Sequence, residues 1–154
     1  MNDDHIQLML MATNVWDRAV ADPTCVTPIL TLVRKDGQQV SFSLMSHHDS
    51  GDLALIRAGI IPLVTPDVAT ARKRLRPLVS QLDVTGAMFV TQASALRLDR
   101  PETARMIVMW TFHRATGSEA RWARLIDAEG KASPPIESDE ATLVGVDWIK
   151  EMVA

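Results

Sequence analysis

Histidine is the side chain best suited to acid–base chemistry near neutral pH, and His113 stands in the most strand-like part of this chain. We expect its imidazole to share one sheet face with two arginines and two threonines, a set that could receive an anionic small molecule. The candidate ligand-binding residues are His113, Arg105, Arg124, Thr111 and Thr91. No carboxylate in the same local pattern would orient the imidazole, and the cross-strand neighbour expected for it, Trp122, favours packing. No catalytic residue is assigned.

Two further histidines are adjacent, in the segment His47-His48-Asp49. Imidazole and carboxylate are ligands that zinc, nickel or iron would take. Adjacent histidines point in different directions, however, and a third ligand would have to come from a distant residue such as His5 or His113. The sequence therefore predicts a polar loop here, with no bound metal and no cofactor.

Other reactive motifs are missing from the sequence. The one cysteine, Cys25, excludes an internal disulfide and a zinc site built from several thiolates, and no histidine base stands beside it. The seven glycines are scattered, so the chain has no serine-hydrolase elbow, phosphate-binding loop or dinucleotide fingerprint. The sequence leaves open whether the protein is an enzyme.

Charge is distributed unevenly along the chain, whose net charge is −3. Residues 66–126 carry 10 basic and 5 acidic side chains, a net of +5, whereas residues 127–154 carry 2 and 7, a net of −5. We expect the acidic tail to lie over the basic middle, either within one subunit or across a dimer. The densest cations, Arg72-Lys73-Arg74 and Arg76, lie on a predicted helix that has no aromatic residue to stack on a base, so a solvated helix face is favoured over nucleic-acid binding.

The clearest local pattern is a β-hairpin over 28–45, turning at Asp36-Gly37. A strict two-residue turn would place Leu30 and Leu32 beside serines. With Gly37 as a left-handed bulge residue, Leu32 instead opposes Val40 and Leu30 opposes Phe42, which gathers the apolar side chains on one face. We favour this second register.

Helices are predicted on both sides of this hairpin. Residues 3–21 carry two apolar stripes and only a narrow polar strip, which indicates a helix with more than one contact surface. A short helix is expected over 52–58, and a longer one begins after Thr65-Pro66 and contains Pro77, where we expect a kink or break. The tail, 138–154, is expected to be helical, with a short strand over 141–146 as the alternative.

Segments 87–98, 104–115 and 120–127 predict a three-strand antiparallel meander. Taking even-numbered residues as one face and odd-numbered residues as the other makes both faces apolar. The odd-numbered face, with Phe89, Ile107 and Met109, is more apolar than a solvated sheet face should be. We expect a helix, a ligand or a second subunit to cover part of it.

Together these patterns predict a single α+β domain over 1–154, an antiparallel sheet made of the hairpin and the meander with helices packed on it. We interpret the chain as a cytoplasmic, non-catalytic accessory or protein-interaction module, homodimeric through the second sheet face or the first helix. A small enzyme, or a ligand-binding protein with a pocket near His113, is the alternative. The acidic opening, Met1-Asn2-Asp3-Asp4, is unlike a secretory signal, and neither a membrane partner nor a nucleic-acid partner is expected.

Overall fold

A computed structural model describes residues 3–13, 15–17, 28–45, 60–64, 67–93, 103–127, 129–137 and 146–154. The helices are α1 (Asp3–Met11), α4 (Val68–Gln81) and α5 (Asp147–Val153). The strands are β1 (Ile29–Arg34), β2 (Gln39–Met45), β3 (Ile60–Val64), β4 (Val84–Ala93), β5 (Thr103–His113), β6 (Ser118–Asp127) and β7 (Ile136–Glu137). The chain is therefore a mixed α+β structure, as expected.

The strands form one sheet in the order β3-β2-β1-β4-β5-β6-β7. Neighbouring strands pair antiparallel, except that β2 and β3 are parallel. The polar loop predicted at His47-His48-Asp49, Cys25 and the short helix expected over 52–58 lie outside the described residues, as does most of the alternative strand over 141–146.

The turn between β1 and β2 has the bulged form that the sequence favours. Gly37 has a φ of 85°, in the left-handed region that glycine adopts without steric cost. Leu32 pairs with Val40 and Leu30 with Phe42, and all four side chains lie on one face.

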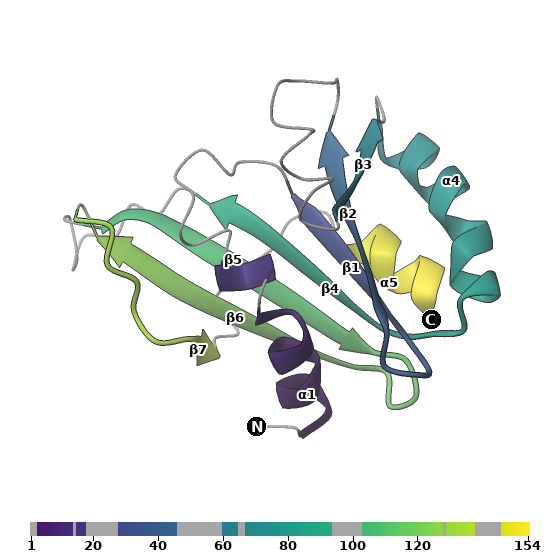
Figure 1. Cartoon of the computed structure of the whole chain (residues 1–154), viewed down its shortest axis with the longest axis horizontal. Helices are drawn as coiled ribbons and strands as arrows, with labels where there is room; N and C mark the ends of the chain where they lie inside the picture. The colour runs from purple at the N-terminus through teal and green to yellow at the C-terminus, as the bar shows by residue number, and fades with distance from the viewer. Residues whose placement is uncertain are drawn as a thin grey trace.

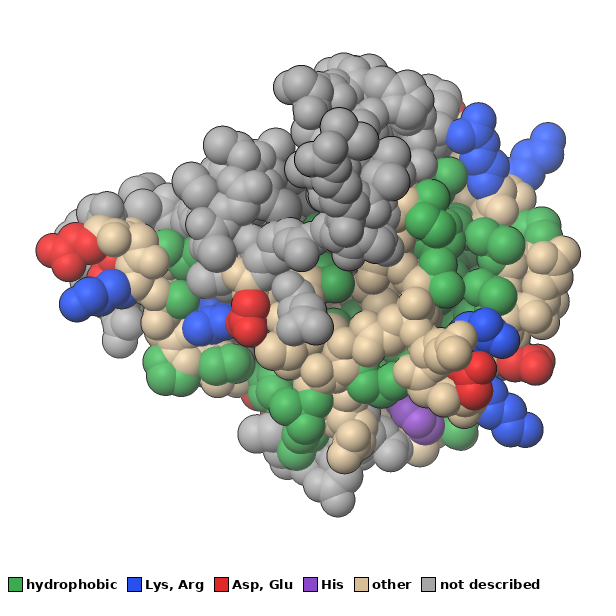
Figure 2. Space-filling view, in the orientation of Figure 1, with side chains coloured by type: hydrophobic (Ala, Val, Ile, Leu, Met, Phe, Trp, Pro, Cys, Tyr) green, Lys and Arg blue, Asp and Glu red, His purple; other side chains and the backbone are tan. Residues whose placement is uncertain are grey.

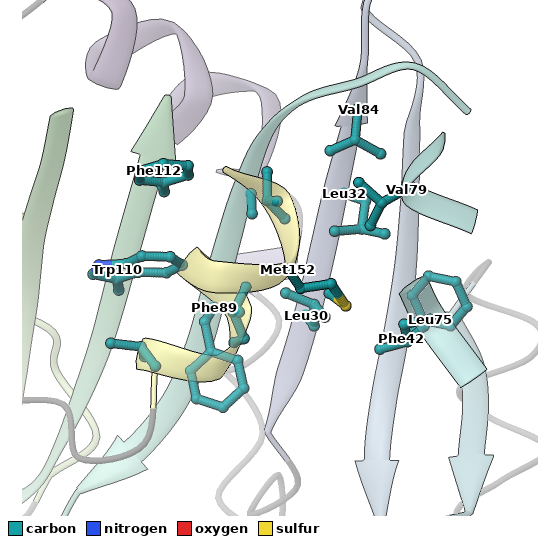
Figure 3. Packing of buried hydrophobic residues seen from close by; sticks show 14 residues of the cluster. Leu30, Leu32, Phe42, Leu75, Val79, Val84, Phe89, Trp110, Phe112 and Met152 are labelled. Carbon is teal, nitrogen blue, oxygen red and sulfur yellow. The ribbon is translucent and has the colours of Figure 1, made fainter. Parts of the chain in front are cut away.

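Helices α4 and α5 cover that face, which we call the first face (Figure 1). Leu75 and Val79 of α4 reach the sheet beside Phe42 and Leu32 (Figure 3), and Trp110 stacks on Phe112 with ring centroids 5.9 Å apart. Helix α4 is continuous through Pro77, so the expected break is absent. Pro77 is exposed, so the carbonyl one turn earlier that loses its helical bond lies on the solvent side.

Helix α1 covers the opposite face of the sheet, which we call the second face (Figure 1). Leu8, Ala12 and Trp16 repeat at helical spacing and pack on Met88 and on residues of β5 and β6. Gly86 makes this close approach feasible, because a β-carbon built there would stand 2.8 Å from Leu8 Cδ2. Helix α1 and the second face were each expected to contact something further, and they cover each other.

The division of the meander into even and odd faces is wrong. Strand β4 pairs Phe89 with Trp110 and Val90 with Met109, so odd residues of β4 share a face with even residues of β5. Because both faces are apolar, alternation within each strand could not fix how the two strands align.

Candidate functional site

Strand pairing separates the five candidate ligand-binding residues. Thr111 and Arg124 lie on the second face, as does His113, which pairs with Ser118 rather than with the expected Trp122. Thr91 pairs with Val108 on the first face, so it does not share a face with the others. Arg105 pairs with Ile126, and its side chain lies outside the described ones. The expected five-residue cluster is therefore not assembled as predicted.

Thr111 lies beneath α1 and contacts a histidine that the sequence analysis considered only as a distant metal ligand. His5 is 2% exposed. Its Nδ1 lies 2.8 Å from Oγ1 of Thr111, and its Nε2 lies 2.9 Å from Oγ of Ser118. His5, Leu8, Ala12 and Trp16 follow helical spacing, and this spacing was the signal that could have placed His5 on the buried side of the helix.

The hydrogen bonds continue from His5 to the turn between β5 and β6. Ser118 Oγ lies 2.6 Å from Thr116 Oγ1, which lies 3.3 Å from Nδ1 of His113. All four bonds are satisfied if each donor points toward His5, and His5 in turn donates to Thr111. Ser118 and His5 thus have the contact of a nucleophile and a base, but neither lines any of the hollows described below. The arrangement anchors α1.

Arg124 is also engaged in structural contacts. Its Nη1 lies 3.1 Å from Oδ1 of Asp17, and its Nε donates to the carbonyl of Ser133 over 3.0 Å. The guanidinium therefore ties strand β6 to the segment after Trp16 and to the segment leading into β7. Among the described side chains, no group of three or more His, Cys, Asp or Glu could hold a metal ion.

The largest described hollow, of about 810 Å³, lies along the outer side of α4. We call its lining the α4 surface. It comprises Val68, Ala69, Arg72, Lys73, Arg76, Pro77 and Ser80. Val68 is 52% exposed, and Nη1 of Arg72 lies 3.4 Å from Oε2 of Glu151 on α5. In Figure 2, hydrophobic side chains gather on the β3 and α4 side of the molecule, with Lys and Arg side chains at both ends of the patch.

A smaller hollow, of about 350 Å³, lies at the end of the sheet next to His113. Lys35 and Arg114 line it together with Thr85 and Asp83. It opens at the strand ends rather than over the meander face, where the alternative interpretation would place a pocket. Its two cations and single carboxylate give it a net positive charge at neutral pH.

Glu119 holds helix α5 beside α4 and against the sheet. Trp110 Nε1 donates to its Oε2 over 2.8 Å, and Lys150 Nζ lies 3.0 Å from its Oε1. Burial by itself would raise the pKa of Glu119, but the hydrogen bonds from Trp110 and Lys150 and the nearby positive charges outweigh it and hold the pKa below its ordinary value.

We expect acid to weaken this anchor. Because the pKa of Glu119 is lower in the folded chain, its contribution is complete above the ordinary glutamate pKa of about 4.3 and is lost as pH falls through the folded value. Glu119→Gln should therefore destabilise the protein at pH 7, and the difference from the unmodified chain should shrink toward pH 3. Urea unfolding at several pH values measures this; a difference independent of pH would contradict the role assigned to the carboxylate.

No family model, curated protein or solved structure matches this chain. In the described residues, no helix is long and apolar enough to cross a membrane. The chain's own geometry must therefore support any assignment of function.

Proposed function

We propose that the chain is a non-catalytic, cytoplasmic protein-interaction module whose binding surface is the α4 surface. The observation that carries this proposal is the hollow of about 810 Å³, which combines exposed Val68 with three cations on one side of one helix. A surface that is apolar and also charged suits a protein partner, since it offers both burial and orientation.

The structural contacts made by residues of the expected site support the same proposal. His5 and Arg124 make contacts that hold α1 and β7 in place, and Thr111 is buried beneath α1. By contrast, helix α4 packs into the core through its other side, with Leu75 and Val79. The residues of the α4 surface can therefore be substituted without disturbing the fold.

Site-specific cross-linking in cells tests this function. A photo-reactive amino acid at Ala69, inside the hollow, should give a discrete adduct with another protein. The same amino acid at Lys131, an exposed position on the turn after β6, serves as the control. Adducts of equal yield at both positions, or none at Ala69, would exclude the α4 surface as the binding site.

We also propose that the protein is a homodimer through the outer side of α1. The second sheet face is covered by α1, so of the two surfaces expected to pair, the outer side of the helix remains, with Leu10 57% exposed. The α4 surface is unsuited to pairing with itself, because a twofold axis would bring like charges together.

Light scattering measures the expected oligomeric state. At micromolar concentration the mass should be twice the 17.0 kDa of one chain. Leu10→Glu should reduce the measured mass to that of a single chain. Gln81→Glu, which adds the same charge at an exposed position at the end of α4, on the other face of the sheet, should leave the dimer intact. A monomer for the unmodified chain at every concentration would refute the dimer.

A second function, the binding of a small anion, is favoured by the hollow at Lys35 and Arg114. Its volume of about 350 Å³ lies in the range of small-molecule sites, and the two cations supply charge of the right sign. Thermal shift with phosphate and citrate tests it. Stabilisation that Arg114→Ala abolishes would establish this second site, whereas a shift unchanged by that substitution would place the anion elsewhere.

A further inference from the structure

We propose that the α4 surface binds an acidic amphipathic segment of a partner protein, and that Glu151 competes with this segment for Arg72. The inference rests on the proposed function and names the chemistry of the partner. It follows from the order of side chains along α4, from their charge, and from the carboxylate that already contacts one of them.

The lining residues run along the helix axis. They recur at 68, 69, 72, 73, 76, 77 and 80, the spacing of a single helix face. Twelve residues of rise correspond to about 18 Å, which matches roughly three turns of a helical occupant lying alongside. Val68 and Ala69 make one end of this surface apolar, and the cations occupy its middle. The occupant should therefore carry one apolar anchor followed by carboxylates.

The charge of the surface selects against other occupants. Arg72, Lys73 and Arg76 stand on the same side of the helix, so a neutral or basic segment would bring no opposite charge to them. Duplex nucleic acid would satisfy the cations, but its phosphates would cover Val68 and Ala69 without burying them in an apolar contact. The cations together with the apolar end therefore favour an acidic peptide over a phosphate backbone.

Helix α5 shows that a carboxylate fits at this surface. Glu151 Oε2 lies 3.4 Å from Arg72 Nη1, and the two side chains remain 62% and 39% exposed. An exposed ion pair of this kind contributes little to stability, so an incoming carboxylate can replace it. Glu151 therefore acts as a weak internal competitor that belongs to the acidic tail of the chain.

Fluorescence anisotropy with a labelled peptide tests the proposal. The probe is a fourteen-residue acetylated peptide with leucine near one end, glutamate at every third or fourth position after it and alanine elsewhere; a second peptide has glutamine in place of glutamate. The full-length protein should bind the glutamate peptide saturably and the glutamine peptide at least about tenfold more weakly. Raising the salt concentration should weaken the binding of the glutamate peptide.

Matched substitutions locate the binding. Lys73→Glu should weaken it by about fivefold or more, whereas Lys131→Glu, the same charge reversal at an exposed lysine on the turn after β6, should change it less than about twofold. Glu151→Gln should tighten it by about twofold to threefold, because it frees Arg72. Circular dichroism checks that each variant keeps its fold.

The outcomes separate this inference from the proposed function. No saturable peptide binding up to about 1 mM, or equal weakening by Lys73→Glu and Lys131→Glu, would overturn the acidic segment. If cross-links at Ala69 persist in that case, the interaction surface stands and only the chemistry of its partner is wrong. Duplex DNA that binds more tightly than the peptide, in a manner sensitive to Lys73→Glu, would replace the peptide with nucleic acid.

Discussion

His5→Leu should lower the free energy of unfolding by about 3 kcal/mol. The substitution removes the hydrogen bonds of His5 with Thr111 and Ser118. The hydroxyl of Thr111 is completely buried, and it loses its hydrogen bond with His5. A buried polar group that loses its partner costs the whole of its desolvation, which is larger than the net value of a typical hydrogen bond. Urea unfolding at pH 7 measures the loss.

His113→Leu is the matched control, since it makes the same change at the other end of the hydrogen-bonded series. His113 is only half buried, and its contact with Thr116 is long at 3.3 Å, so we expect a loss below about 1 kcal/mol. Equal losses at the two histidines would show that His5 does not anchor α1 as the geometry indicates.

The contact between Leu8 and Gly86 gives the second large effect. Leu8→Ala should cost about 2 to 5 kcal/mol, because it empties the space between α1 and the sheet. Gly86→Ala should cost about 1 to 3 kcal/mol, since the new β-carbon would stand 2.8 Å from Leu8 Cδ2 and 3.2 Å from the carbonyl oxygen of Phe112.

The double variant tests whether the two residues act through this one contact. With Leu8 shortened to alanine, the β-carbon at position 86 loses its closest neighbour and fills part of the vacated space. The double variant should therefore be more stable than the sum of the single losses predicts, by about 1 kcal/mol. Strict additivity in urea unfolding would mean that α1 does not lie over Gly86.

Local patterns were sufficient for the mixed α+β class and for the pairing of β1 with β2. In that pair a single register gathers Leu30, Leu32, Val40 and Phe42 on one face, and Gly37 supplies the turn. The alignment of β4 with β5 was not accessible in the same way. Both strands are apolar on both sides, so no polar face marked which residues of one strand match those of the other.

The candidate site shows the same limit. Thr91 was grouped with His113 by counting along the chain, and the pairing of Thr91 with Val108 places it on the opposite face. His5 was missed because its partners, Thr111 and Ser118, are more than a hundred positions away in sequence. Contacts of this range depend on how a helix docks, which periodicity alone does not determine.

The cations of α4 can be identified from the sequence, but their place in a binding surface cannot. A helix with Arg72, Lys73 and Arg76 on its outer side is ordinarily a solvated helix. The hollow beside them and the contact of Arg72 with Glu151 are tertiary features, formed when α4 and α5 pack on the same sheet face. Among the described residues, the ion pair of Arg72 with Glu151 is a contact between the acidic tail and the basic middle of the chain.

An NMR titration of the isotope-labelled protein with the acidic peptide tests most directly whether the α4 surface is the site that binds a partner protein. The amide signals of residues 68–80, together with those of the end of α5 near Glu151, should shift in proportion to the bound fraction, while those of Thr111, His113 and Ser118 stay in place. Shifts centred on the turn between β5 and β6, with α4 unchanged, would contradict the account and return the binding site to the region of His113.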